Sequence, residues 1–144
     1  MAKRMKIVLD GKITCTATRD EERAPKTVAA LWTTLPIEDR TIQVRWSGSA
    51  WRTEKNYELL PVDHPLENEA GKLQAGDIIY FPAYRAKLVK VGFAYGPAQW
   101  LNPFAEIAPV AHIGRIDENL ETFAKRCEQI IFEGPLSVQL SRIE

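Results

Sequence analysis

Residues that hold a fold together covalently or through a metal are scarce in this sequence. Its 144 residues include two cysteines, Cys15 and Cys127, and two histidines, His64 and His112. The cysteines form no CxxC pair, so their spacing argues against a disulfide framework and a structural zinc site. We expect both to be small buried side chains, with a nucleophilic cysteine as the alternative. The sequence predicts no metal site and calls for no cofactor.

An excess of charge and a long apolar run are also absent. The chain carries 19 Lys and Arg against 19 Asp and Glu, so no overall basic field favours nucleic-acid binding. No apolar run approaches the roughly 18 residues that span a bilayer, and the first residues lack the pattern of a secretory signal. We therefore expect a cytoplasmic protein that binds neither nucleic acid nor membrane. Without a break in composition, residues 1–144 are predicted to form a single domain.

Local patterns predict a hairpin and two helices. Asp10-Gly11 lies between the β-prone runs 6–9 and 13–18, which is a strong hairpin signal. Apolar residues at helical spacing predict a helix over 25–35, and a second apolar stripe predicts another over 118–132. The chain therefore opens with a β-hairpin and carries one helix near each end.

The rest of the chain favours strands. Alternation over Thr41–Trp46 predicts a half-buried strand with Ile42, Val44 and Trp46 on one face. Residues 61–75 are interpreted as a long surface loop. Further β-compatible runs are 51–60, 78–81, 88–95, 107–116 and 136–140.

These elements predict a mainly β fold without the strand-helix-strand rhythm of a parallel sheet. About eight strands with short connections favour antiparallel pairing, and a sheet of this size removes its edges by closing. We predict a closed antiparallel eight-stranded barrel with the two helices capping its open ends.

Several sequence motifs together resemble a known family. They are 20–32 with its Pro25-Lys26-Thr27, Arg45-Trp46-Ser47-Gly48, 75–80, 93–99 and 114–120. The first is similar to the passage from strand to first helix in cyclophilins. The set resembles the bacterial cyclophilin-like DUF3830 family over nearly the whole chain, which implies a cyclophilin-like barrel.

The resemblance also bears on function. Prolyl isomerases of the cyclophilin fold carry Phe-His-Arg after the first helix, whereas this sequence has Gln43-Val44-Arg45, so isomerase activity is disfavoured. Cyclophilin-like bacterial proteins of this type include the cucumopine and mikimopine synthases. Their chemistry is implied here: histidine condenses with 2-oxoglutarate to an imine, and the imidazole carbon then closes the ring in a Pictet-Spengler reaction. No catalytic residue of those enzymes can be matched motif by motif.

Three classes of function therefore remain open. We favour an enzyme that condenses an amino acid with a 2-oxo acid. The alternatives are a non-catalytic binder of a small anionic metabolite and a peptide-binding barrel like a peptidyl-prolyl isomerase. The expected partners are small molecules, and a homo-oligomer stays open.

Two anionic substrates require cationic groups, and arginine presents a fork of donors that fits a carboxylate. Arg45 and Arg115 lie in the family-like motifs and are the arginines predicted to bind substrate. Each is explained equally well as a solvated surface side chain. Gln99 could hold substrate through an amide that both donates and accepts, or it could bond its own loop backbone.

Closing the ring requires a general acid and a general base. The candidate catalytic residues are His112, Tyr95 and Glu54. His112 shares a strand face with Val110 and is either a core histidine or a pocket base, whereas Glu54 could also be a solvated edge carboxylate.

Two indoles could form walls around a planar substrate ring. Trp46 and Trp51 bracket the Ser47-Gly48-Ser49 turn and are predicted to bind substrate in this way. The alternative for both is plain core packing.

Overall fold

The structure is a computed structural model, and it describes residues 4–61, 63–83, 88–101 and 106–143. Its strands are β1 (Arg4–Leu9), β2 (Ile13–Arg19), β3 (Ile37–Gln43), β4 (Gly48–Thr53), β5 (Glu69–Ala70), β6 (Lys72–Leu73), β7 (Asp77–Ala83), β8 (Leu88–Gln99), β9 (Val110–Glu118) and β10 (Ser137–Ile143). Its helices are α1 (Pro25–Thr34), the short 3-10 turn η1 (Arg45–Ser47), α2 (Leu120–Cys127) and α3 (Ile130–Glu133). None of the helices in these ranges combines the length and apolar character that a membrane crossing requires.

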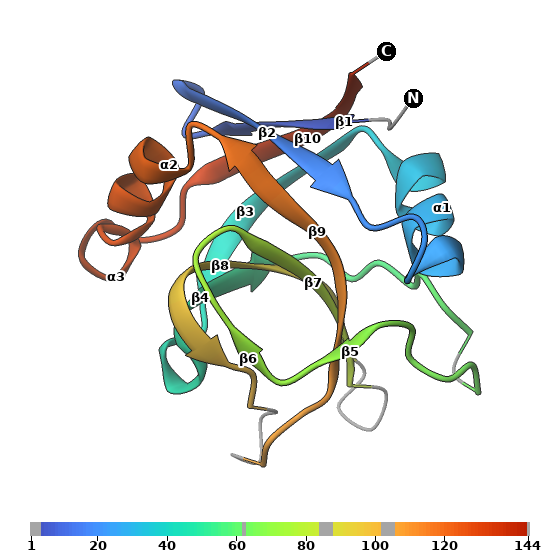
Figure 1. The fold of residues 1–144 in the computed structure, drawn as a ribbon. Helices are drawn as coiled ribbons and strands as arrows, with labels where there is room; N and C mark the ends of the chain where they lie inside the picture. Colours follow the sequence, from blue (N-terminus) through green and yellow to red (C-terminus); the bar gives the residue numbers. More distant parts are fainter. Residues whose placement is uncertain (1–3, 62, 84–87, 102–105, 144) are drawn as a thin grey trace.

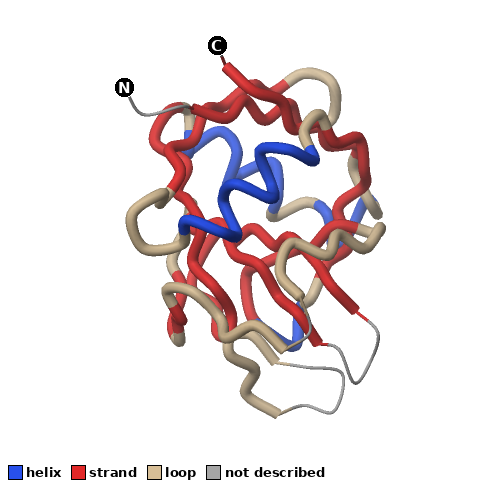
Figure 2. The backbone as a smooth tube through the Cα atoms, turned by 90° about the vertical axis from the view of Figure 1, so that its right-hand side faces the viewer, coloured by secondary structure: helices blue, strands red, loops and turns tan. Residues whose placement is uncertain are grey.

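Eight of the described strands close into an antiparallel barrel. They follow one another in the order β2-β1-β10-β3-β4-β8-β7-β9, and β9 pairs back onto β2. Figure 1 shows α1 on one side of this barrel and α2 with α3 on the other, and Figure 2 shows a helix lying across the ring of strands. The predicted barrel with two helical regions is therefore confirmed. The second helix is divided into α2 and α3.

The core is centred on an indole from β4. Trp51 is fully buried and stacks on Phe93, with ring centroids 4.4 Å apart. Phe123 of α2 packs against the same indole at 6.3 Å, and Trp51 Nε1 donates to Cys127 Sγ at 3.2 Å. Burial raises the pKa of the Cys127 thiol to about 12. Cys15 is buried in the same way and its pKa is raised equally, so both cysteines are structural, as the sequence predicts.

The strand after α1 differs from its prediction. β3 ends at Gln43, and its buried positions include Asp39 and Thr41. Trp46 lies in η1 instead of a strand, and 56% of its surface is exposed. The predicted alternation was wrong because two polar side chains occupy the inner face, where a sequence pattern expects apolar ones.

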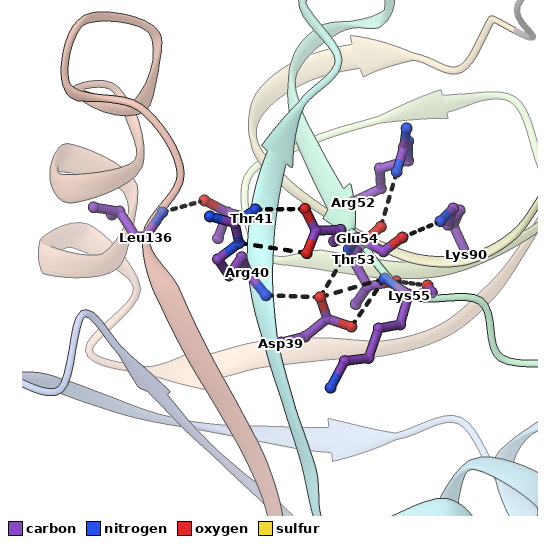
Figure 3. Close-up of polar contacts among 9 residues, drawn as sticks. All are labelled: Asp39, Arg40, Thr41, Arg52, Thr53, Glu54, Lys55, Lys90 and Leu136. Atoms are coloured by element: carbon purple, nitrogen blue, oxygen red, sulfur yellow. Dashed lines mark hydrogen bonds and ion pairs between the residues drawn. The ribbon is translucent and has the colours of Figure 1, made fainter.

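Hydrogen bonds explain why Asp39 can be buried. Its carboxylate accepts from the backbone N–H groups of Arg40 at 2.7 Å and Glu54 at 2.8 Å (Figure 3). It also accepts from the Tyr57 hydroxyl at 2.5 Å. Burial and this contact raise the pKa of Tyr57, which keeps the phenol protonated as the donor. The buried Asp39 therefore ties β3 to the chain that leaves β4.

The first turn of α1 is capped from the long loop. Glu67 Oε1 accepts from the backbone N–H of Thr27 at 2.7 Å and from its hydroxyl at 2.9 Å. Glu67 Oε2 accepts from the backbone N–H of Lys26 at 3.3 Å. Burial alone would raise the pKa of Glu67, but these hydrogen bonds outweigh it and the pKa is lowered. The predicted loop over 61–75 thus contains a helix cap, together with β5 and β6.

Closure of the barrel leaves no room for a Cβ at Gly114 in β9. A Cβ on Gly114 would stand 2.6 Å from the backbone oxygen of Thr18, across the β2/β9 pairing. We expect Gly114→Ala to lower the free energy of unfolding by about 1–3 kcal/mol, the usual cost of overpacking, as measured by urea unfolding. Gly71→Ala is the control, because a Cβ there meets nothing within 4 Å. Equal losses in the two variants would contradict a tight closure.

The Glu67 cap should make stability depend on pH. Glu67→Gln is expected to lower the free energy of unfolding at neutral pH by about 1 kcal/mol, as other helix N-caps do. Because the folded pKa is lowered, the contribution is complete above the unfolded value near about 4.3 and is lost as the pH falls through the folded value. Urea unfolding should show the two proteins converging in stability at low pH. Glu69→Gln, in exposed β5, is the control and should show no such convergence.

Candidate functional site

Side chains from β7 and β9 meet at one buried carboxylate. Asp77 begins β7, and its side chain is 8% exposed. Its Oδ1 accepts from Arg115 Nη1 at 2.7 Å and lies 2.9 Å from His112 Nε2. Its Oδ2 accepts from the backbone N–H of Gln74 at 2.8 Å. Both carboxylate oxygens are therefore engaged, and Asp77 holds two β9 side chains in place.

An irregularity in β9 brings those two side chains together. Residues three apart on a regular strand point to opposite faces of the sheet. Here Ile78 pairs with Gly114 while Ile79 pairs with His112, so the register shifts between them. A bulge of this kind re-aims side chains. It allows His112 and Arg115 to reach the same Asp77.

This cluster opens on a hollow of about 170 Å³, which we call the β2/β9 hollow. The lining residues come from the end of β2 and from β9, and they are Thr18, Arg19, Asp20, His112, Gly114 and Arg115. Asn68 links two of the lining residues at the edge of the hollow. The Asn68 Nδ2 donates to Asp20 Oδ2 at 3.0 Å and to the backbone oxygen of His112 at 2.9 Å. The hollow therefore exists only because β2 and β9 pair.

The arrangement combines a proton acceptor with a cation. A carboxylate only accepts, so the Nε2 of neutral His112 carries the proton that faces Asp77 and Nδ1 keeps its lone pair. Within the described ranges no hydrogen bond occupies that Nδ1. The Arg115 side chain is 40% exposed, and Asp77 engages only its Nη1. The hollow can therefore bind an anion and accept a proton beside it.

Several other predicted site residues lie away from this hollow. Arg45 is exposed in η1, and Gln99 ends β8 opposite Lys72 of β6. Tyr95 is 5% exposed, and its hydroxyl accepts from Gln43 Nε2 at 2.6 Å. These side chains do not line the β2/β9 hollow, so the predicted set is dispersed.

Glu54 lies on the barrel surface beyond β4. It is exposed and pairs with Arg40 at 2.6 Å (Figure 3). The hydrogen bond from Arg40 lowers the pKa of Glu54, so this carboxylate stays ionised at neutral pH. An ionised carboxylate held by a guanidinium is not available as a general acid.

The two predicted indole walls are also separated. Trp51 is the centre of the core, whereas exposed Trp46 lines an apolar hollow of about 200 Å³ with Arg52, Phe81, Leu88, Trp100 and others. Neither indole lines the β2/β9 hollow. The structure thus joins His112 and Arg115 and leaves the indoles elsewhere.

Sequence reasoning missed Asp77, which organises the cluster. The available signal was its place in the Ala75-Gly76-Asp77 motif, directly before a buried strand. Arg19 was also missed, since it lies one residue before the first family-like motif. In the described part of the chain, no three His, Cys, Asp or Glu side chains are grouped closely enough to hold a metal ion.

Comparisons with known proteins identify a family and a shared fold. Residues 7–142 match the family described as "Protein of unknown function (DUF3830)". No protein of curated function matches the chain. The structure of McbB in complex with tryptophan has a TM-score of 0.71 at 22% identity, covering 95% of this chain and 44% of McbB. The chain therefore spans less than half of McbB's length.

A second solved structure matches over the whole length of both chains. It is the solution structure of a hypothetical protein from Archaeoglobus fulgidus, with a TM-score of 0.60 at 20% identity, covering 99% of this chain and 95% of that one. At such identities both structures show a common fold and nothing further.

The two histidines should hold opposite neutral tautomers. His112 Nε2 faces the Asp77 carboxylate, whereas His64 Nδ1 lies 2.7 Å from the backbone oxygen of Pro65. Both oxygens only accept, so His112 should carry its proton on Nε2 and His64 on Nδ1. Long-range ¹H–¹⁵N NMR at a pH where both rings are neutral measures this directly. Asp77→Asn should release the His112 preference and leave His64 unchanged, and one shared tautomer would contradict the assignment.

Proposed function

This chain belongs to the DUF3830 family, and from that premise and the geometry of the β2/β9 hollow we propose that it condenses an amino acid with a 2-oxo acid. The amino acid is one whose side chain carries a nucleophilic ring. McbB, which shares the fold, was solved with the amino acid tryptophan bound. The resemblance to cucumopine and mikimopine synthases implies histidine and 2-oxoglutarate, and this pair is the first to be tested.

The proposed reaction has two bond-forming steps. The amine of the amino acid attacks the carbonyl carbon of the 2-oxo acid, a C–N bond forms, and the carbonyl oxygen leaves as water to give an imine. A ring carbon then attacks the protonated imine carbon and forms a C–C bond. The proton on that ring carbon leaves to a base, and the imine nitrogen becomes a secondary amine. The product is the sum of both substrates minus one water, with no oxidation or reduction.

Three side chains of the cluster suit these steps. The unused donors of Arg115 bind the carboxylate of the amino acid, since a guanidinium fork fits that group. The Nδ1 of His112 accepts the ring proton, because its lone pair is free. Asp77 is a positioning residue: it fixes the His112 ring and stabilises the imidazolium that forms.

The observation that carries the proposal is the shared Asp77 oxygen. It lies 2.7 Å from Arg115 Nη1 and 2.9 Å from His112 Nε2, beside the hollow that both side chains line. A carboxylate anchor and a proton acceptor are thus held next to each other by one rigid group. Structural roles alone would not require His112 and Arg115 to keep unused atoms at the same hollow.

The proposal is tested by incubating the protein with histidine or tryptophan and with either 2-oxoglutarate or 4-methyl-2-oxopentanoate, and detecting the condensation product by mass spectrometry. A reaction without protein gives the spontaneous background. His112→Gln should lower kcat by about 10²–10⁴-fold, the usual worth of a positioned acid or base. Arg115→Gln should chiefly raise KM for the amino acid, by about tenfold or more, because it removes charge-assisted hydrogen bonds.

His64→Gln is the matched control for His112→Gln. His64 bonds the Pro65 carbonyl and does not line the β2/β9 hollow, so its replacement should leave turnover unchanged. Saturable substrate binding without product above background would show a non-catalytic binder and would refute the proposed reaction.

A further inference from the structure

A second hollow shares one lining residue, Arg19, with the first. We call it the α1 hollow; its volume is about 340 Å³. Arg19 and Glu21 line it on one side, and residues of α1, including Pro25, Val28 and Trp32, line it on the other. Arg19 also lines the β2/β9 hollow. In Figure 1, β2 leads directly towards α1, so this space lies at the exit of β2.

Arg19 is buried yet incompletely bonded. Its side chain is 6% exposed, and its Nη2 donates to Glu21 Oε1 at 2.6 Å. Its Cζ lies 3.9 Å from the centroid of the Trp32 ring, which fixes the plane of the guanidinium. Its Nε is buried and has no hydrogen-bond partner within the described structure. A buried donor without a partner is uncommon in folded proteins and requires an explanation.

We propose that Arg19 anchors the carboxylate of a 2-oxo acid whose apolar side chain lies in the α1 hollow; this inference rests on the proposed function. Nε and Nη2 lie on the same edge of the guanidinium, and that edge can donate two parallel hydrogen bonds to a carboxylate. The bound carboxylate supplies the partner that Nε lacks. Pro25, Val28 and the Trp32 ring then contact the side chain of the acid.

The pairing of β2 with β9 brings both anchors to the β2/β9 hollow, which Arg19 and Arg115 line together. Arg19 pairs with Gly114, and the preceding residue, Thr18, pairs with Arg115. Arg19 lines the α1 hollow as well as the β2/β9 hollow, whereas Arg115 lines the β2/β9 hollow. Because Arg19 lines both hollows, an amino acid on Arg115 and a 2-oxo acid on Arg19 meet at the β2/β9 hollow, as formation of an imine between them requires.

Glu21 competes with the acid for the anchor. Its side chain is 47% exposed and holds only the Nη2 of Arg19. Without ligand it neutralises the buried cation, and an incoming carboxylate displaces it towards solvent. Its charge also disfavours a second carboxylate in the α1 hollow. The hollow therefore favours a 2-oxo acid with one carboxylate and an apolar side chain over a dicarboxylate such as 2-oxoglutarate.

Titration of the protein with 4-methyl-2-oxopentanoate tests this assignment. The reporter is the indole N–H signal of Trp32 in ¹H–¹⁵N NMR, identified with Trp32→Phe. Arg19→Gln should weaken binding by about tenfold or more, the range for loss of charge-assisted hydrogen bonds. Glu21→Gln should tighten it by about two- to fivefold, because it weakens the competing pair. A structural role for Arg19 alone gives no reason for these opposite changes.

Arg142→Gln is the matched control. Arg142 Cζ also lies near Trp32, at 5.5 Å from the ring centroid, and its guanidinium donates to the Trp32 backbone oxygen, but it lines neither hollow. Its replacement should leave binding unchanged. If Arg19→Gln proves unfolded, the Glu21→Gln result decides. Unchanged binding in Glu21→Gln, or tighter binding of 2-oxoglutarate than of 4-methyl-2-oxopentanoate, would overturn the proposal.

The outcome separates this inference from the proposed reaction. Binding that depends on Arg19 and Glu21, without any condensation product, would support the anchor and refute the reaction. Condensation that is unaffected by Arg19→Gln and Glu21→Gln would support the reaction and refute the anchor.

Discussion

The pairing of β2 with β9 is the constraint on which the site depends. It closes the barrel, and it is possible because Gly114 offers no Cβ to the Thr18 backbone oxygen. The same pairing brings the end of β2, with Arg19 and Asp20, against His112 and Arg115. An open sheet of the same strands would keep these two pairs of residues on separate edges. The pairing that closes the barrel therefore also assembles the site.

The sequence was informative wherever structure depends on near neighbours. The Asp10-Gly11 turn has positive φ at both residues, as a tight hairpin of this type needs, and α1 begins at Pro25 as expected. The face of β3 was mispredicted because Asp39 and Thr41 are buried with distant partners. Thr41 Oγ1, for example, accepts from the backbone N–H of Leu136 at 3.0 Å (Figure 3). Such long-range compensation leaves no local pattern.

The kinds of side chain in the site were predictable from the sequence, but only some of the individual residues were. His112 and Arg115 were each selected for chemical reasons, but strand periodicity places them on opposite faces. Only the register shift opposite Ile78 and Ile79 brings both to Asp77. Conversely, Arg45 was chosen for its place in a family-like motif and Glu54 for its carboxylate, and neither lines the β2/β9 hollow. A bulge and a ring closure are properties of paired strands, and a single strand's sequence does not report them.

The long loop joins two parts of the molecule through neighbouring residues. Glu67 caps the first turn of α1, and Asn68 bonds both Asp20 and the backbone of His112. Asn68 also accepts from the His112 backbone N–H at 3.0 Å, so it extends the pairing of β9 by one step. If this stretch detaches, the helix start and the rim of the β2/β9 hollow lose their support together. We therefore expect both hollows to open in one step of local unfolding, so that a ligand bound in either hollow also protects the amides around the other from exchange with solvent.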